Sequence, residues 1–269
     1  MPMYNGGPYI AACIQSVIDQ SFEDWALYVV DDASTDDSPQ TVAAFDDPRI
    51  RLTRNPANLG QAGNWNRCME LARGEYVKLL CADDALAPGC LHRQVSALDE
   101  HPTAVIVAGL RRVILSHGWV AKRRHGLGPL RGLVPGRDAL NTCVRDGVNY
   151  LGEPPAVLMR RDALPSSHPW RPEAGYWLDF DLWARLLTEG DLVAQHDVAA
   201  DFRVHAKSDS AALFRDRQVD DAAALFTRLA ADATTGISAQ DAEAGVRGAT
   251  RAARRRRNFY RAMAAVGFR

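Results

Sequence analysis

Along residues 1–115, short apolar runs alternate with segments in which apolar residues recur every three or four positions. The runs at residues 26–30, 50–53, 75–80 and 104–115 predict strands. Helical spacing predicts helices at residues 9–19, 63–72 and 90–101, and Ser38-Pro39 is typical of a further helix start. This order of elements predicts an α/β fold built on a mostly parallel, doubly wound sheet.

The start of the chain departs from this pattern. A doubly wound sheet normally opens with a strand of about five or six residues, whereas loop-type residues 2–7 follow Met1 directly. Either the sheet lacks a strand or the functional protein has residues upstream of Met1. We hypothesise that a few apolar residues upstream belong to it, and the stability of an extended chain tests this.

The last third of the chain is helical in pattern. Residues 179–189 carry an apolar face and stop at Gly190, and an Ala-rich helical tail begins near residue 216. With 269 residues, the chain suits one large domain with an appendage. We therefore expect a main domain over residues 1–210 and a helical C-terminal extension over residues 211–269.

Composition narrows the class of protein. No apolar run approaches the roughly 18 residues of a membrane-spanning helix, and no secretory leader is visible after Met1. The five cysteines are odd in number and lack CxxC spacing, so neither a disulfide framework nor a zinc site follows. These features predict a cytoplasmic protein with reduced, mostly buried thiols.

The net charge of −1 conceals an asymmetry. Residues 247–269 hold eight arginines and no acid, so the preceding 246 residues carry a net charge of −9. This tail either lies on an anionic membrane surface or packs its apolar side on the domain. The acidic remainder argues against nucleic acid as a partner. Residues 103–137, basic and rich in glycine, predict either a loop that closes over phosphates or a solvated surface loop.

Two acidic pairs end predicted strands, where doubly wound sheets bind ligands. Asp31 and Asp32 suit hydrogen bonds to a nucleoside, and the alternative is that Asp32 caps the turn at residues 33–37. Asp83 and Asp84 suit a hard divalent cation, and the alternative is a plain turn. Asp179, at a predicted helix start, suits a proton acceptor, and the alternative is a helix cap.

Taken together, these features resemble the family 2 glycosyltransferases, inverting enzymes of the GT-A fold, over residues 2–210. The resemblance rests on a series of short motifs in family order. They are Pro2-Met3-Tyr4-Asn5, Val30-Asp31-Asp32-Ala33-Ser34-Thr35-Asp36, Asn58-Leu59-Gly60, Asn64-Trp65-Asn66, Ala72-Arg73-Gly74-Glu75-Tyr76, Asp83-Asp84, Asp179-Phe180-Asp181-Leu182-Trp183 and Phe202-Arg203-Val204-His205.

The resemblance implies a role for each matching residue. Asp179 would be the general base. Asp84 would bind a divalent metal, Mn²⁺ or Mg²⁺, and His205, near the diphosphate, would be a second candidate metal ligand. A structural role for His205 stays open. The residues implied on the donor side are Pro2, Tyr4, Asn5, Asp31, Asp32, Asn58, Gly60, Asn64 and Asp83.

Two positions depart from the family pattern. The metal motif is Cys81-Ala82-Asp83-Asp84, without an acid at the first position of a strict Asp-x-Asp. The expected base Asp179 follows Leu178, where a second acid is usual. The departures make metal binding less secure than the base.

The implied function is inverting, metal-dependent transfer of a sugar from a nucleotide-diphospho-sugar to a hydroxyl acceptor. The setting implied is cell-surface polysaccharide or glycoconjugate synthesis, with a saccharide or lipid-linked acceptor and peripheral contact with the inner membrane face through the basic tail. Two alternatives stay open: an inactive nucleotide-sugar-binding or scaffold module of the same fold, and a nucleotidyltransferase, although no Lys or Arg adjoins Gly6-Gly7.

Overall fold

The structure, a computed structural model, describes residues 1–205 and 217–265, with side chains up to residue 258. The boundary expected at residues 210 and 211 therefore lies outside the described residues. The first part of the chain alternates β1 (Pro2–Met3), α1 (Ile10–Ile18), β2 (Leu27–Asp31), α2 (Ser38–Ala43), β3 (Ile50–Arg54) and α3 (Gly60–Leu71). This order agrees with the predicted elements.

The middle and last parts add two groups of elements. The strands are β4 (Tyr76–Val77), β5 (Ala85–Leu86), β6 (Ala104–Leu115), β7 (Val120–His125), β8 (Gly132–Val134), β9 (Val157–Arg160) and β10 (Asp191–Val204). The helices are α4 (Cys90–Glu100), α5 (Gly136–Asp146), α6 (Leu178–Glu189), α8 (Gln218–Ala231) and α9 (Ala239–Ala265), with short 3₁₀ turns η1 (Gly7–Tyr9), η2 (Pro154–Ala156) and η3 (Pro172–Trp177).

Local sequence explains why these segments adopt their structure. In α1, Ile10, Cys13, Ile14 and Val17 are buried at helical spacing and form one apolar face. Helix α5 ends at Gly147, whose φ of 67° lies in the left-handed region that favours glycine. Asp138 lies in the first turn of α5 and Arg145 in its last turn, where their charges interact favourably with the helix dipole.

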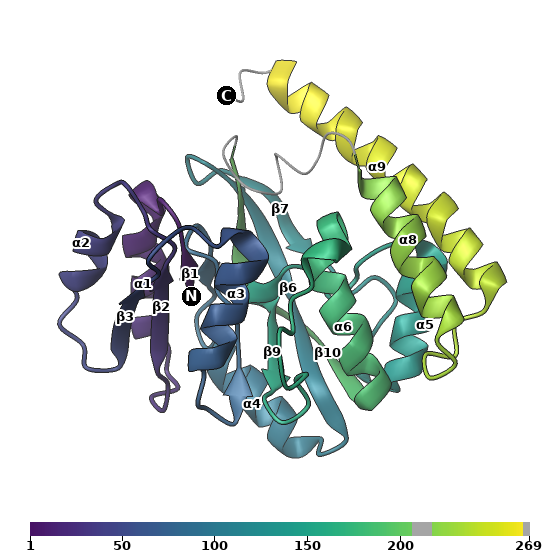
Figure 1. Cartoon of the computed structure of the whole chain (residues 1–269), viewed down its shortest axis with the longest axis horizontal. Coiled ribbons are helices and arrows are strands. Elements are labelled where there is room, and N and C mark those ends of the chain that lie inside the picture. The colour runs from purple at the N-terminus through teal and green to yellow at the C-terminus, as the bar shows by residue number, and fades with distance from the viewer. Residues whose placement is uncertain (206–216, 266–269) are drawn as a thin grey trace.

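The strands form two sheets. Strands β1, β2 and β3 form a parallel sheet in the order β1-β2-β3. The second sheet has seven strands, in the order β4-β9-β6-β10-β5 with β7 beside β6 and β8 beside β10. Figure 1 shows the two sheets with helices packed around them. The expected α/β class is confirmed.

Strand direction is more mixed than the alternation predicts. In the second sheet only β6 and β10 are parallel, and every other pairing is antiparallel. The alternation of strands and helices predicts the order of the elements along the chain. It predicts parallel strands only where a helix connects two strands and packs on the sheet, because other connections allow antiparallel pairing. The strand expected at residues 75–80 is also shorter, because only Tyr76 and Val77 pair.

The structure corrects two expectations about loops. Pro2 and Met3 lie in β1 and pair with Val30 and Asp31, so only residues 4–7 of the loop expected at residues 2–7 are outside a strand. The basic stretch at residues 103–137 is largely β-structure, because β6 and β7 form a hairpin. The glycines of this stretch predicted a loop. In addition, four of the six residues of β7 are exposed, so β7 lacks the alternation of apolar and polar residues that predicts a strand.

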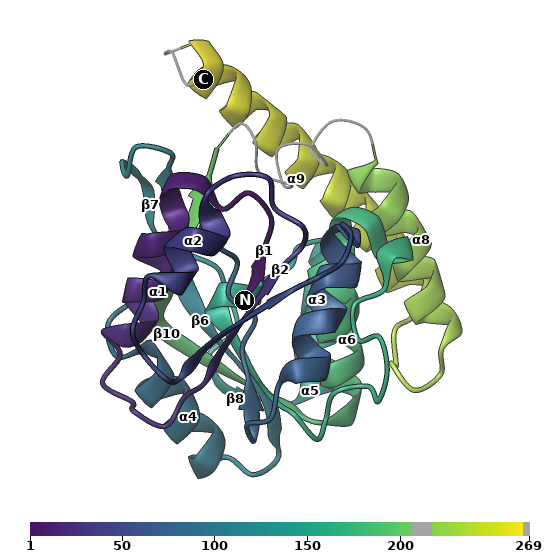
Figure 2. The same cartoon turned by 60° about the vertical axis from the view of Figure 1, so that its left-hand side comes forward.

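The C-terminal helices share the core of the main sheet. Ala222, Leu225 and Phe226 of α8 and Ala249 of α9 belong to the same buried cluster as Trp177 and residues of α6. Figures 1 and 2 show α8 and α9 packed beside α5 and α6. The apolar side of the expected basic tail is therefore used for packing, over the part of α9 whose side chains the structure describes.

One buried carboxylate joins α6 to α8. Asp181 is 2% exposed, accepts hydrogen bonds from Arg185 at 2.8 and 3.1 Å, and pairs with Arg228 of α8. Asp181 thus has a structural role.

Within the described residues, no helix combines the length and the apolar content needed to cross a bilayer.

Candidate functional site

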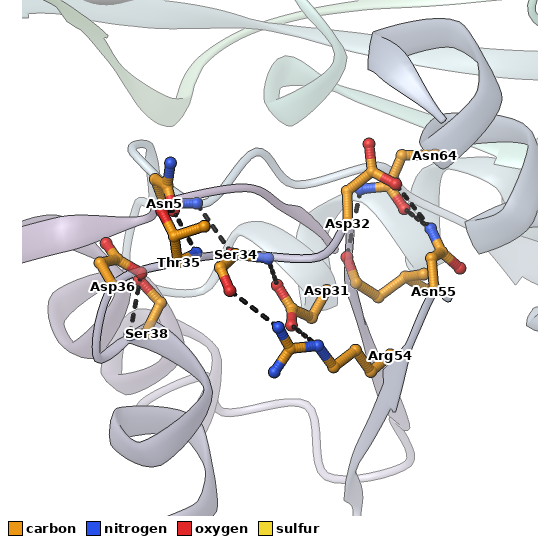
Figure 3. A network of polar contacts seen from close by, with 11 residues as sticks. Asn5, Asp31, Asp32, Ser34, Thr35, Asp36, Ser38, Arg54, Asn55 and Asn64 are labelled. Atoms are coloured by element: carbon orange, nitrogen blue, oxygen red, sulfur yellow. Dashed lines mark hydrogen bonds and ion pairs between the residues drawn. The ribbon is translucent and has the colours of Figure 1, made fainter. Parts of the chain in front are cut away.

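The polar network at the end of β2 is built around Asp31 and Asp32 (Figure 3). Asp31 is fully buried: its Oδ1 accepts the Ser34 N–H at 3.0 Å, and its Oδ2 lies 3.4 Å from Arg54 Nε. The turn that follows β2 is thus capped by Asp31 and not by Asp32, the residue that the capping alternative named. Arg54 also donates to the Ser34 carbonyl oxygen at 2.8 Å.

Asp32 is held on the opposite side of the same network. Its Oδ1 accepts hydrogen bonds from Asn55 Nδ2 at 2.8 Å and from the Leu59 N–H at 2.9 Å. Asn55 Nδ2 also donates to Asn64 Oδ1 at 3.1 Å, and Asn64 donates to the Val30 carbonyl oxygen. The structure therefore brings Asp32 and Asn64, far apart in sequence, together through Asn55.

The loop after β1 is tied to the loop after β2. Asn5, with a φ of 48°, donates its N–H to Ser34 Oγ at 2.9 Å, and its Oδ1 accepts the Thr35 N–H at 2.8 Å. Tyr4 beside it is 54% exposed. Because these two loops fix each other, Tyr4 is presented to solvent from a rigid base next to the Asp32 network.

Asn58 and Gly60 form the start of α3. Asn58 Oδ1 accepts the Gly60 N–H at 2.9 Å, and Gly60 has a φ of 72°. Their contacts explain how the chain turns into α3. The adjoining Leu59 N–H reaches Asp32.

Asp83 and Asp84 lie in the turn before β5, opposite the end of β10. Asp83 Oδ2 is 3.0 Å from His205 Nε2, and the Asp83 carbonyl oxygen accepts from Arg203 Nε at 2.9 Å. Asp84 is 3% exposed, and its Oδ1 accepts the Arg203 N–H at 2.8 Å. The structure therefore brings His205 together with Asp83, 122 positions away in sequence.

Burial, and next the charge of Asp83, raise the pKa of the Asp84 carboxyl well above its usual range. Two adjacent carboxyl groups resist simultaneous ionisation in such a place, and a bound cation would relieve their repulsion. The donor set suits Mg²⁺ or Mn²⁺ bound by one or two carboxylates, with phosphates and water completing the shell. In the described part of the chain, no group of three His, Cys, Asp or Glu side chains forms a complete cage.

Asp179 lies in the first turn of α6 and is partly buried. Burial raises the pKa of its carboxyl well above the usual range, Glu153 raises it further, and Arg111 lowers it. Glu153 also raises the pKa of Asp84. The charge of Glu153 therefore raises the pKa of both the expected metal ligand and the expected base.

Glu153 and Arg111 were not predicted from the sequence as residues of the site. Arg111 is 4% exposed and forms an ion pair with Glu153 through its Nε. Arg111 was visible only as part of a basic stretch, and Glu153 only as the residue before Pro154-Pro155. The remaining omissions are Asn55, which follows β3, and Arg203, which was quoted in a motif without a role.

A hollow of 760 Å³ lies between the start of α3 and the segment that leads into α6. Its lining includes Leu59, Asn66, His168, Trp170 and Leu178. Asn66 holds the two sides together, because its side chain bonds both the N–H and the carbonyl oxygen of Trp170 at 2.9 and 2.8 Å. The hollow adjoins both Leu59, which contacts Asp32, and Leu178, which precedes Asp179.

The basic helix α9 contributes one arginine to this side of the molecule. Arg256 lies with its Cζ 5.3 Å from the ring centre of Tyr176 and donates to Gln218 Oε1 at 2.9 Å. By contrast, Arg247, Arg251, Arg254 and Arg255 are exposed. At 3.6 residues per turn these four fall within about 100° of the helix circumference. We call them the arginine face of α9.

Comparisons of sequence agree with this geometry. The family model described as Glycosyl transferase family 2 matches residues 1–165. Protein MT1568 of Mycobacterium tuberculosis (strain CDC 1551 / Oshkosh) is 34% identical over 194 residues, which cover 70% of this chain and 60% of MT1568. The Escherichia coli enzyme WfgD, a UDP-Glc:α-D-GlcNAc-diphosphoundecaprenol β-1,3-glucosyltransferase, is 37% identical over 98 residues, 36% of this chain and 39% of WfgD. The Rhizobium meliloti (strain 1021) succinoglycan biosynthesis protein ExoO is 35% identical over 112 residues, 42% of this chain and 32% of ExoO.

Comparisons of structure show that the chain shares its fold with two solved proteins. A fragment of Staphylococcus aureus TarS in complex with UDP-GlcNAc superposes with a TM-score of 0.66 at 15% identity, over 90% of this chain and 67% of that one. The mannosyltransferase PcManGT of Pyrobaculum calidifontis, in complex with GDP-Man and Mn²⁺, gives 0.63 at 18% identity, over 99% and 74%. The chain spans less than two thirds of the length of MT1568, WfgD and ExoO.

Proposed function

The chain belongs to glycosyl transferase family 2, and from this premise we propose that it transfers a sugar, with inversion, from a nucleotide-diphospho-sugar to a hydroxyl acceptor. The transferase domain in this proposal is residues 1–210, with residues 211–269 as a helical extension packed on it. The acceptor is a saccharide or lipid-linked saccharide of a cell-surface polysaccharide, in keeping with the relatives WfgD and ExoO.

One observation carries the proposal: Glu153 raises the pKa of both Asp84 and Asp179, and burial, followed by the charges of Asp84, Asp83 and Asp179 together, raises the pKa of the Cys81 thiol. Such a concentration of acid around one spot disfavours ionisation and is costly without a partner. A divalent cation with a diphosphate, together with an acceptor hydroxyl, gives each carboxylate a partner.

The donor nucleoside is assigned to the network at the end of β2. Asp32 would accept hydrogen bonds from the ribose or the base, held in place by Asn55 and the Leu59 N–H. Tyr4 would cover the base from the first loop, since it is exposed beside the rigid Asn5 turn. Asp31 supports this arrangement from within, because its oxygens are engaged by Ser34 and Arg54.

The cation is assigned to Asp84 and Asp83, with His205 beside the diphosphate. When bound, a divalent cation neutralises charge on the leaving diphosphate. Asp84 would meet it from a carboxylate oriented by the Arg203 N–H, and His205 would hold Asp83 in position. The guanidinium of Arg203 is packed 4.5 Å from the ring centre of Tyr9, which keeps this side chain in place.

Asp179 would remove the proton from the acceptor hydroxyl as its oxygen attacks the anomeric carbon. The new C–O bond forms opposite the breaking bond to the diphosphate oxygen, so configuration inverts. The proton moves to a carboxylate Oδ of Asp179, and the electron pair leaves with the diphosphate. The raised pKa of Asp179 makes it a stronger base than an ordinary aspartate.

The proposed location is cytoplasmic, with the arginine face of α9 in contact with an anionic inner membrane surface. A lipid-linked acceptor would then be supplied at that surface. The support is the exposure of four arginines on one side of α9, while its other side packs on the domain.

The test is turnover of a panel of nucleotide sugars with Mn²⁺ or Mg²⁺, followed by NMR of the product's anomeric proton. We expect release of one nucleoside diphosphate and a product of opposite anomeric configuration. Retention of configuration would contradict the mechanism. Donor binding without any turnover, with acceptor saccharides present, would favour an inactive binding module, and diphosphate release from a nucleoside triphosphate would favour a nucleotidyltransferase.

A further inference from the structure

The segment that leads into α6 bends sharply just before the proposed base. Within η3, Gly175 has a φ of 55° and a ψ of −123°, outside the helical region. Trp177 is the N-cap residue of α6, and Asp179 lies in the first turn of that helix. Only three residues separate Gly175 from Asp179. The direction that the chain takes at this bend therefore sets where the Asp179 carboxyl group lies.

A carboxylate of α8 holds the bend. Asp221 Oδ2 accepts the Tyr176 N–H at 2.9 Å. A Cβ at Gly175 would come within 2.3 Å of the same oxygen, so this carboxylate lies directly against the backbone of the bend. Asp221 is in the first turn of α8, where the helix dipole favours a negative charge. The hydrogen bond therefore fixes the peptide between Gly175 and Tyr176 on α8.

Gln218, which begins α8, holds the next residue of the segment. Its carbonyl oxygen accepts a hydrogen bond from Trp177 Nε1 at 3.0 Å. Trp177 is 3% exposed, and Phe226 of α8 packs against its ring with 5.2 Å between the ring centres. The residue that starts α6 is thus fixed on α8 by a buried hydrogen bond and by aromatic packing.

The two C-terminal helices also hold α6 after the proposed base. Arg228 of α8 pairs with Asp181, two residues beyond Asp179. Helix α9 supports this arrangement, since Arg256 donates to the side chain of Gln218 at 2.9 Å. Figures 1 and 2 show α8 lying beside α6. Asp179 is therefore placed between two residues of its own segment, Trp177 and Asp181, that are both bound to α8.

We propose that Asp221 and Gln218 are positioning residues for the transfer reaction, because they hold the bend before α6 and so keep Asp179 within reach of the acceptor hydroxyl. This role rests on the proposed function, in which Asp179 is the general base. A general base must lie within hydrogen-bonding reach of the proton that it removes. A misplacement of about 1 Å can lower a rate about a hundredfold. The helical extension is then a working part of the transferase.

Three substitutions in the first turn of α8 test this role. Asp221→Ala removes the acceptor of the Tyr176 N–H, Asp221→Asn keeps an oxygen that can accept it, and Asp220→Ala removes an exposed carboxylate from the same turn. We expect kcat of Asp221→Ala to fall at least about tenfold, with KM for the nucleotide sugar unchanged. Asp221→Asn should keep kcat within about threefold of the wild type, and Asp220→Ala should match the wild type. Rates are compared per folded molecule, below the melting temperature of each variant.

Trp177→Phe tests the second contact, because it removes the indole N–H that Gln218 accepts and keeps an aromatic ring. We expect kcat to fall about fivefold, in line with the loss of one buried hydrogen bond. If Asp221→Ala does not fold, this variant decides, and a wild-type kcat overturns the proposal.

A double variant tests whether Asp221 acts through the base. Added to Asp179→Asn, Asp221→Ala should lower kcat no further, because residues that act as a unit are not additive. A further tenfold loss in that background would overturn the proposal.

The remaining outcomes separate this role from a structural one and from the proposed function. A lower melting temperature of Asp221→Ala with a wild-type kcat would make Asp221 a structural residue and overturn the proposal, as would equal losses of kcat in Asp221→Ala and Asp220→Ala. Wild-type turnover in Asp179→Asn would overturn the assigned base together with this role. A large loss in Asp179→Asn beside an unaffected Asp221→Ala would overturn this role alone.

Discussion

Arg111 on β6 and Glu153 before η2 form a partly buried ion pair whose charges act on the carboxyl group of Asp179. The guanidinium lies between Gly126 and Gly152, where a Cβ would come within 2.6 and 2.2 Å of Arg111 Nη1. The guanidinium of Arg111 is therefore closely packed. Since the two charges of the ion pair shift the pKa of Asp179 in opposite directions, the pair sets how readily the proposed base ionises.

The pH dependence of turnover follows from this pair. Burial, and next Glu153, raise the pKa of Asp179, so activity should fall on the acid side well above the usual titration range of an aspartate. Glu153→Gln removes a negative charge and should move the acid limb of kcat/KM to lower pH by about one unit. A profile measured from pH 5 to 9 decides, and an unmoved limb would contradict the assigned electrostatics.

Asp179→Asn tests the base itself. We expect kcat to fall by about 10² to 10⁴, with nucleotide affinity nearly unchanged, because general-base catalysis typically contributes that much. The raised pKa of Asp179 means that folding favours its protonated form. Protonated Asp179 stabilises the folded protein fully below the pKa that this residue has in the unfolded chain. This stabilisation is lost as the pH rises through the pKa of Asp179 in the folded protein, so a neutral Asn should not destabilise the protein at pH 8.

Asp181→Asn is the matched control on the same helix. Asp181 is 2% exposed and is paired with Arg185 and Arg228. Breaking such a buried network should lower the free energy of unfolding by roughly 3 kcal/mol. Urea unfolding separates the two variants, and wild-type turnover in Asp179→Asn would remove that residue from the proposed role.

The contrast between Asp179 and Asp181 shows how far sequence carries the assignment. Asp31, Asp32, Asp83, Asp84 and Asp179 could all be proposed as site residues from the sequence, because each is an acid at the end or start of a short periodic element. The structural role of Asp181 was not, since its partner Arg228 is 47 positions away.

The same limit applies to the rest of the fold. The order of strands and helices followed from local periodicity, but the antiparallel pairing of β4 with β9 depends on contacts between residues far apart in sequence. The hydrogen bond from the Arg203 N–H to Asp84 joins residues 119 positions apart, and no local sequence pattern predicts it. Strand β7 was missed because most of its residues face solvent.

Asp84→Asn tests the proposed metal ligand while keeping an oxygen that can accept the Arg203 N–H. We expect the Kd for a nucleotide sugar with Mn²⁺ to rise at least about tenfold, or 1.4 kcal/mol. Binding without metal should change little, because the nucleoside contacts lie elsewhere. Calorimetry with and without Mn²⁺ measures both, with exposed Glu243→Gln as the control. Equal affinities in the variant and the wild type would remove Asp84 from the metal site.

Gly152→Ala tests the packing around Arg111. A Cβ at Gly152 would lie 2.2 Å from Arg111 Nη1 and 2.5 Å from its Cζ, at a φ of +88°. Gly118→Ala is a close control, because its φ is +85° and nothing lies within 4 Å of the added Cβ. Backbone strain of about 1 kcal/mol should affect both, and the clash should add to it only at Gly152. Thermal unfolding measures the difference, and equal losses would mean that the guanidinium moves aside freely.

The arginine face of α9 gives the last prediction. Each basic residue near an anionic bilayer contributes about 1 kcal/mol, so changing Arg247, Arg251, Arg254 and Arg255 to Gln should weaken binding to phosphatidylglycerol vesicles at least about a hundredfold. A second variant changes four scattered exposed arginines, Arg51, Arg73, Arg123 and Arg137, and alters net charge equally. We expect that variant to sediment with vesicles nearly as the wild type does, because only clustered charge lies close to one surface. Binding should also weaken as salt rises from 0.05 to 0.5 M. Equal losses in the two variants would mean that net charge, and not the face of α9, governs the contact.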